Sequence, residues 1–490
     1  MGQRLIILYL LLAMNQLFAI DFETFFENHT MRIDYFHVGD KESDEIVLDM
    51  IYKEGEWAGN PNSLFDEFNN GKYYYKIFDV NSNTLIYSKG FNNYFHEYQT
   101  TAPAGKGIKR AYHETALIPY PKNKSLFVIE KRDQYNILSP IYQKVIDPAD
   151  YHIITENKAN SNDHVYEANI AGHPHQCVDI VFVGEGYTAK EKRKFNKDVK
   201  RYMNELFSIE PFKRNKEKFN VRGILRYSQE SGVDEPTKNR YKNTILDATF
   251  NSFDSPRYLL TENNKMLHDI AARVPHDAII ILANIDRYGG GGIYNFYSIS
   301  TANESRWNDF VFIHEFGHSF AGLADEYYSS SVAYDDFYPA GIEPTEPNIT
   351  RLLNSKQLKW KAMLDKGLEI PTDWGKSQYD SMSIRVGELH RDRNAAVADL
   401  KAENKTETEI DKCRENFKQD IAATRQRLKD FMSNHPLRGK VGVFEGAGYS
   451  TEGIYRPTLN SMMHQFTDQD KKFYPVSEHA IETVIDYYTK

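Results

Sequence analysis

His314, Glu315 and His318 have the residue types and the spacing that bind and use a metal ion. Two histidines four positions apart lie on one face of a helix, about one turn apart, so both imidazoles can reach one ion. Imidazole is a common zinc ligand, and a catalytic zinc takes three protein ligands and keeps one position for water. A glutamate beside the first ligand can act as general base on that water. The HExxH pattern therefore predicts a catalytic zinc site.

The surrounding residues predict a buried helix that ends soon after the second histidine. Asn308 and Asp309 give a helix-start signal, and an apolar run, residues 310–313, follows them. Further apolar residues continue at helical spacing as far as Leu323, and Gly322 offers a stop in the left-handed conformation. The alternative is a purely structural helix that carries the motif by chance.

The third ligand is predicted from the residues that follow the helix. In metzincins the pattern is HExxHxxGxxH, with the third ligand three residues past the glycine. Here the glycine is Gly322, and Asp325 lies three residues past it. A carboxylate is an accepted zinc ligand. Asp325 is therefore the predicted ligand and Glu326 the alternative, while a glutamate from a later helix also fits the spacing.

A second stretch near the C-terminus is typical of the methionine-bearing turn that lies beneath such a metal. It is the sequence Ser461-Met462-Met463-His464, in which Met463 is the predicted turn methionine and Met462 its neighbour. The alternative is two core methionines that fill a gap.

Several further residues are candidates for roles around the metal. Tyr327, Tyr455 and His464 could donate hydrogen bonds to an oxyanion that forms during acyl transfer, although structural roles are the alternative for each. Glu326, if it is not a ligand, could orient one.

Four stretches occur in one order along the chain: VDIVFVGEGYTAKE (178–191), HEFGHSFAGLADEY (314–327), VGVFEGAGY (441–449) and GIYRP (453–457) before the methionine turn. Together they resemble the bacterial IgA-specific metalloendopeptidase family, which are secreted, metzincin-like zinc peptidases. The resemblance implies zinc ligands at His314, His318 and Asp325 and a catalytic acid–base at Glu315. Nothing in the sequence indicates an antibody substrate.

The N-terminus predicts export. Residues 1–19 have the features of a secretory signal peptide, with Arg4, an apolar run over 5–13 and Ala19 before the expected cut. The run is too short to span a bilayer, and no other stretch is long and apolar enough. We expect a periplasmic, secreted or cell-surface protein without a transmembrane span.

The charge distribution limits the classes of partner that we expect, and the cysteine content limits the disulfides. The net charge is −9, and acidic and basic residues are interspersed. Without a basic stripe, nucleic acid is not an expected partner, and the expected partner is a protein or peptide substrate. One pair of cysteines, Cys177 and Cys413, is not a disulfide framework, and a buried thiol is the prediction for Cys413.

The predicted fold is α+β. Residues 20–153 contain about seven short apolar runs between turn signals, which predict a β-sandwich, and the polar stretch 154–169 is the predicted linker. Residues 170–490 predict a metzincin-like catalytic domain, a mixed sheet with helices. A charged helical insertion is expected at about 388–434, either as a hairpin packed on the domain or as a partner-binding arm.

A glycine-rich stretch precedes the HExxH helix. The glycines 289–292 are expected to form a loop whose backbone passes close to another part of the protein. GIYNFYSIS, residues 292–300, is the predicted edge strand, to which a substrate peptide could add as a further strand.

The sequence thus predicts an exported zinc endopeptidase in which Glu315 is the general base. Two alternatives stay open: a surface-binding or adhesive module with a structural or degenerate zinc site, and a zinc amidase that acts on non-protein amides.

Overall fold

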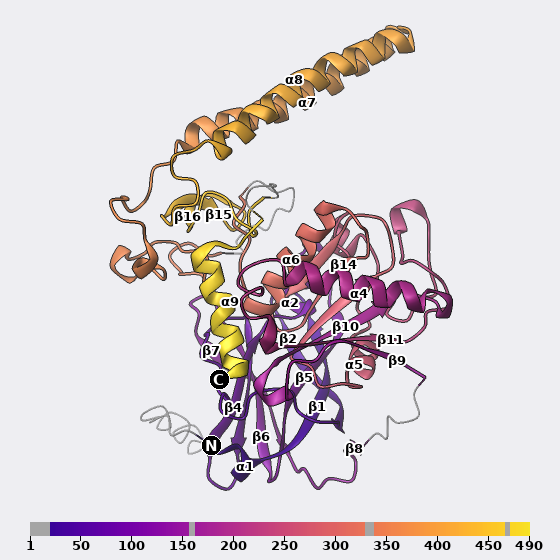
Figure 1. The fold of residues 1–490 in the computed structure, drawn as a ribbon, viewed down its shortest axis with the longest axis vertical. Coiled ribbons are helices and arrows are strands. Elements are labelled where there is room, and N and C mark those ends of the chain that lie inside the picture. The colour runs from indigo at the N-terminus through magenta and orange to yellow at the C-terminus, as the bar shows by residue number, and fades with distance from the viewer. Residues whose placement is uncertain (1–19, 156–161, 329–337, 466–470) are drawn as a thin grey trace.

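The computed structural model describes residues 20–155, 162–328, 338–465 and 471–490 (Figure 1). The predicted signal peptide, 1–19, lies outside the described residues. An N-terminal part made of β-sheets packs against a C-terminal part built on a mixed sheet with helices, so the fold is α+β, as predicted. Within the described ranges, no helix combines the length and apolar character that crossing a membrane requires.

The N-terminal part consists of two four-stranded sheets, with strand orders β5-β1-β2-β8 and β4-β3-β6-β7. Successive side chains of a strand point to opposite faces, and Tyr73, Tyr75 and Ile77 of β3 all point into a core that both sheets share. The predicted β-sandwich is confirmed. Its elements are α1 (Phe22–Phe25), β1 (Phe26–Gly39), β2 (Asp44–Lys53), β3 (Tyr73–Asp79), β4 (Thr84–Phe91), α2 (Tyr94–Gln99), α3 (Ala102–Gly105), β5 (Arg110–Pro121), β6 (Ser125–Arg132), β7 (Leu138–Ile146) and β8 (Ile154–Thr155).

The C-terminal part is built on a six-stranded mixed sheet of order β13-β14-β12-β10-β11-β9. Its four inner strands run parallel, while β13 and β9 pair antiparallel at the two edges. The strands are β9 (His164–Asn169), β10 (Val178–Glu185), β11 (Phe219–Leu225), β12 (Ala278–Ala283), β13 (Gly290–Ile293) and β14 (Tyr297–Thr301). The helices around it are α4 (Lys192–Leu206), α5 (Asn264–Ala271), α6 (Arg306–Ala321) and α9 (Tyr474–Thr489).

Both faces of this sheet are covered. Ile180 and Phe182 of β10 pack in one cluster with residues of α4, α6 and α9. Val181 and Val183 pack on the opposite face with residues of α5 and, from the N-terminal part, of α2. Every residue of β10 is therefore buried, as is usual for a strand in the middle of a parallel sheet. The N-terminal part thus shares a hydrophobic core with the mixed sheet.

The predicted linker is a strand in its second half. Within 154–169, residues 164–169 form β9, which pairs antiparallel with β11 at the edge of the mixed sheet. The side chains of β9 are exposed or half-buried, because an edge strand has only one neighbour. Its polar composition therefore resembles that of a linker, and the sequence did not reveal the strand.

The predicted insertion is a long helical hairpin, α7 (Lys376–Ala402) and α8 (Glu407–Ser433), that projects away from the body (Figure 1). Helix α7 begins before the predicted residue 388, and Gly387 lies inside it, where glycine disfavours a helix prediction. Only the base of the hairpin joins a buried cluster. The expectation that the hairpin packs along the domain is therefore wrong. Cys413 on α8 is half-buried rather than buried, and both cysteines are free thiols.

The glycine run forms a strand rather than a loop, but the predicted close approach is present. Residues 290–293 are the edge strand β13, while 297–301 form β14, which pairs on both sides, so GIYNFYSIS is not one edge strand. A Cβ at Gly292 would lie 2.2 Å from the carbonyl oxygen of Glu315 in α6. Glycine at this position lets β13 lie directly against the helix that carries the HExxH motif.

We expect Gly292→Ala to destabilise the protein by about 1–3 kcal/mol, because a new methyl group in a packed contact forces the strand and α6 apart. Gly55→Ala is the matched control, since a Cβ there would meet no atom within 4 Å. Thermal unfolding of the two variants measures the effect. Equal melting temperatures for Gly292→Ala, Gly55→Ala and the wild type would contradict the close approach.

Candidate metal centre

Helix α6 presents the HExxH motif. Ser305 is its N-cap and accepts a hydrogen bond from the backbone N–H of Asn308, so the helix begins before the predicted Asn308–Asp309 signal. Asn308 is instead buried inside the helix, where its amide oxygen accepts from the Thr301 hydroxyl at 2.6 Å. The helix ends at Gly322, whose φ of 59° is the left-handed conformation expected for a glycine stop.

Three donor atoms meet beside this helix. The Nε2 atoms of His314 and His318 are 3.1 Å apart, and Asp325 Oδ1 lies 3.0 Å from the first and 3.3 Å from the second. Ligand atoms of a tetrahedral zinc site, with bonds of about 2.0–2.1 Å, lie roughly 3.3 Å from one another. The triangle thus has the size of one face of a zinc tetrahedron, and no fourth histidine, cysteine or acidic residue among those described joins it.

The hydrogen bonds of these residues fix which atoms face the centre. The Nδ1 atoms of His314 and His318 lie 2.9 Å from the Met462 carbonyl and 2.5 Å from the Leu323 carbonyl. A carbonyl only accepts, so each Nδ1 carries the hydrogen and each Nε2 of a neutral ring offers its lone pair. Asp325 Oδ1 is buried without a hydrogen-bond partner among the described residues. The donor set therefore fits a divalent metal such as zinc.

The charges of the site attract one another. Burial lowers the pKa of His318, but the Asp325 carboxylate more than offsets this and raises it to about 9. Burial raises the pKa of Asp325, yet the two imidazoles reverse the effect and hold it well below its usual range. Burial also raises the pKa of Glu315, which the histidines oppose only in part. Each histidine must be neutral at Nε2 to bind a metal ion.

Glu326, the alternative ligand, is engaged elsewhere. It is fully buried, and its two carboxylate oxygens accept hydrogen bonds from Asn348 at 2.9 Å and from Ser461 at 2.7 Å. Its backbone N–H donates to the Met463 carbonyl at 2.8 Å. Burial raises its pKa to about 7. Glu326 thus ties the segment that carries Asp325 to the methionine turn and does not belong to the donor triangle.

The methionine turn lies against α6. The His464 N–H donates to the Ser461 carbonyl at 3.1 Å, which closes a turn over residues 461–464. Met463 and Met462 are fully buried, and a Cβ at Gly317 of α6 would lie 3.0 Å from the Met463 sulfur. The sulfur thus packs under the metal-site helix, while the Met462 carbonyl orients His314.

The three candidate oxyanion donors differ in their positions. Tyr327 lines the cleft that also contains the three donor atoms, and its ring is nearly parallel to that of His314, with the ring centres 6.4 Å apart. His464 lines it too, but its Nδ1 donates to the Asn460 amide oxygen at 3.0 Å, and burial lowers its pKa. Its neutral Nε2 is therefore an acceptor, which cannot donate to an oxyanion. Tyr455 packs in a separate cluster with Val441 and is not among the described residues that line the cleft.

Tyr449 is a site residue that the sequence reasoning missed. Its hydroxyl donates to Asp325 Oδ2, which leaves Oδ1 for the metal centre. Tyr449 lies within the VGVFEGAGY stretch, but it is far from the motif along the chain, and neither spacing nor composition connects it with Asp325.

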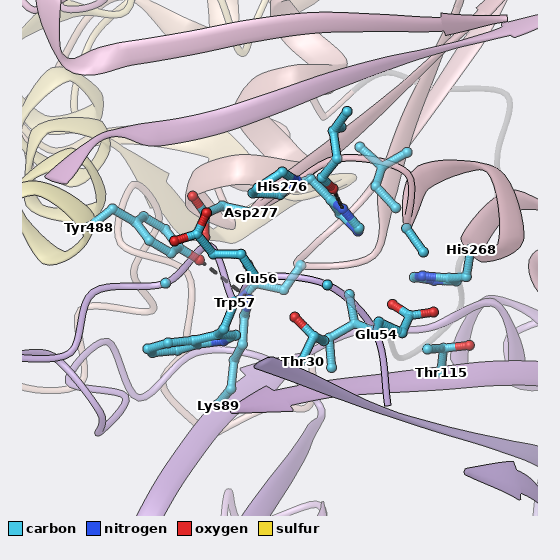
Figure 2. A pocket seen from close by; sticks show the side chains of 18 of the residues that line it. Thr30, Glu54, Glu56, Trp57, Lys89, Thr115, His268, His276, Asp277 and Tyr488 are labelled. Atoms are coloured by element: carbon cyan, nitrogen blue, oxygen red, sulfur yellow. Dashed lines mark hydrogen bonds between the residues drawn. The ribbon is translucent and has the colours of Figure 1, made fainter. Parts of the chain in front are cut away.

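The donor triangle lies in the larger of two pockets that the described residues line. The smaller cavity, about 250 Å³, lies between the N-terminal sheets and the mixed sheet (Figure 2). Lys89 and Asp277 line it, and the Lys89 amine donates to the Tyr488 hydroxyl at 3.3 Å. The larger one is a cleft of about 1780 Å³ whose lining includes the donor triangle and Glu315. The candidate chemistry therefore belongs to the larger cleft.

The β13 edge beside the cleft has few free backbone groups. The Gly290 carbonyl accepts from Leu259 N–H at 3.4 Å, and the Tyr294 carbonyl accepts from Asn92 N–H at 2.9 Å. Gly292 lies between these two positions, and its backbone groups point to the same side as those of Gly290. A peptide could therefore pair with this edge at one residue, rather than along the longer strand that the sequence suggested.

We expect Tyr449→Phe to weaken metal binding by about 10- to 100-fold, because it removes the hydrogen bond that orients the Asp325 carboxylate. Tyr455→Phe removes the same hydroxyl from a tyrosine outside the cleft and serves as the control. Competition with a zinc chelator gives the affinity of each variant. If both variants bind zinc as the wild type does, Tyr449 has no part in holding the ligand.

Comparison with known families agrees with this geometry. Residues 21–143 match the family described as Peptidase M64 N-terminus, and residues 167–485 match the family described as IgA Peptidase M64. No curated protein matches the chain. The second match covers more than half of the 490 residues. The chain therefore belongs to the IgA peptidase M64 family, a family of zinc metallopeptidases.

Proposed function

We propose that the protein is an exported endopeptidase that holds one zinc ion with His314, His318 and Asp325 and uses Glu315 as general base. The observation that carries this proposal is the triangle of donor atoms, with edges of 3.0–3.3 Å, in a cleft that Glu315 also lines. Membership of a metallopeptidase family supports hydrolysis of a peptide bond as the reaction.

Each site residue has a distinct part in this chemistry. Zinc, when bound, polarises a carbonyl group and makes water more acidic. Glu315 accepts a proton from the attacking water and later passes it to the leaving amine. Its burial beside the histidines raises its pKa, which suits a group that must both take and return a proton. Tyr327 is the remaining candidate donor to the oxyanion, since it lines the same cleft.

The shape of the cleft supports a peptide substrate. Pockets for small molecules measure about 300–1,000 Å³, whereas this cleft measures about 1780 Å³. Gly292 offers backbone groups at the β13 edge, which can pair with a peptide main chain of any sequence. Hydrolysis of a non-protein amide has no such feature in its favour.

The alternative of a binding module with a degenerate zinc site loses support. A structural zinc site closes all four positions with protein ligands. Among the described residues three donor atoms converge, and a glutamate lies beside them in an open cleft.

Export is proposed from the sequence alone. Residues 1–19 lie outside the described residues, and their charge and apolar pattern predict a cleaved signal peptide.

We expect Glu315→Gln to lower kcat by at least about 100-fold while zinc stays bound, because the amide cannot accept the proton from water. The measurements are peptide hydrolysis and the zinc content of the purified variant. Hydrolysis within tenfold of the wild-type rate would rule out Glu315 as general base.

Asp325→Ala should lose most of the bound zinc together with activity, since it removes one corner of the donor triangle. Glu326→Gln is its matched control and should keep zinc, because a glutamine oxygen can still accept the hydrogen bond from Ser461. Metal analysis after dialysis decides between them. Zinc loss in Glu326→Gln but not in Asp325→Ala would reverse the ligand assignment.

A further inference from the structure

The N-terminal sheets form one wall of the cleft that contains the donor triangle. This wall includes side chains from the loop before β3, from the end of β4 and from α2, and it extends to β5. Its lining residues include Asn70, Asn92, Tyr94, Glu97, Tyr98 and Arg110. A peptide bound at the metal site would therefore touch both parts of the protein.

The wall is fixed to the catalytic elements. The Asn70 amide donates to the carbonyl of Gly322, where α6 ends, at 3.0 Å. The Asn295 amide, from the turn between β13 and β14, donates to the Gly90 carbonyl at 2.8 Å. Helix α2 also packs in the same hydrophobic cluster as α5 and β10. The N-terminal part thus has one defined position beside the site and does not behave as a removable spacer.

Glu97 on α2 is a carboxylate of this wall for which the described residues provide no lysine or arginine partner. The Tyr258 hydroxyl donates to it at 3.2 Å, and none of the described lysines or arginines forms an ion pair with it. Burial raises its pKa to about 7, and Glu97 lines the same cleft as His318 and Glu315. Glu97 is half-buried, and a carboxylate that is partly removed from water without a counter-charge is costly for a protein to maintain.

Glu262 lines the same cleft but differs from Glu97 in its exposure to solvent and in having a cationic partner. Its side chain is 53% exposed, and it pairs with Arg110 at 3.8 Å. Solvent and the guanidinium thus already satisfy Glu262, whereas Glu97 accepts a hydrogen bond from Tyr258 and can still pair with a cation that enters the cleft.

We propose that Glu97 is a substrate-binding residue of the N-terminal wall that selects a cationic group of the peptide, either a lysine or arginine side chain or a free α-amino group. This inference rests on the proposed endopeptidase function. A cation that enters the cleft would form a charge-assisted hydrogen bond with the Glu97 carboxylate, and such bonds are stronger than those between neutral groups.

The test uses zinc-loaded protein and a set of peptides in which lysine or norleucine occupies each position around the cleaved bond. Norleucine has the four-carbon side chain of lysine without its ammonium group. Each peptide is prepared with a free and with an acetylated N-terminus, which separates a basic side chain from an α-amine as the recognised group. The ratio of kcat/KM for the charged and the neutral peptide is taken within each variant, so a general loss of active protein cancels.

We expect the wild type to prefer the charged peptide at one position by about 10- to 100-fold, which is the usual effect of a charged hydrogen bond. Glu97→Gln should bring the ratio close to one, because the glutamine keeps an oxygen for the Tyr258 hydroxyl and loses only the charge. Glu262→Gln, the matched control, should keep the wild-type ratio.

Two results would overturn the proposal. One is a wild-type enzyme that cleaves peptides without any preference for a cation, and the other is a preference that survives in Glu97→Gln. Failure of the wild type to cleave any peptide is a different outcome. It would contradict the endopeptidase function itself, and the role of Glu97 would be rejected with it.

Discussion

The turn at Gly322 is the constraint on which the site depends. Helix α6 must stop directly after His318 so that the chain can return and bring Asp325 beside the two imidazoles. Gly322 has a φ of 59°, a backbone conformation that residues other than glycine rarely adopt. A Cβ there would also lie 2.1 Å from the Asn70 amide nitrogen. One glycine thus allows the third donor to reach the site and the N-terminal part to dock against it.

The remaining order of the site comes from residues far away along the chain. The Leu323 carbonyl, in the turn itself, orients His318, but the carbonyl that orients His314 belongs to Met462, in the methionine turn. The buried Glu326 joins the two segments through Ser461. The helix and its turn provide the donors, and the C-terminal segment holds them in one arrangement. The N-terminal wall completes the cleft, so segments from both the N-terminal and the C-terminal part of the chain line one site.

Sequence reasoning reached the features that local spacing determines. The HExxH helix, its glycine stop and the β-sandwich follow from periodicity and turn residues. The prediction of Asp325 as third ligand follows from its spacing to Gly322. Features that depend on contacts between distant segments could not be predicted from the sequence. Strand β9 has the composition of a linker because it lies at a sheet edge, and Tyr449 contacts Asp325 from a hairpin that no local pattern connects to the motif. The shared core of α2 and the mixed sheet was hidden for the same reason.

The most direct test of the account is a crystal structure of the zinc-loaded protein with anomalous diffraction recorded at the zinc absorption edge. The account predicts one strong peak at about 2.0–2.2 Å from His314 Nε2, His318 Nε2 and Asp325 Oδ1. A peak bound by Glu326 or another carboxylate in place of Asp325, or no peak inside the donor triangle, would contradict it.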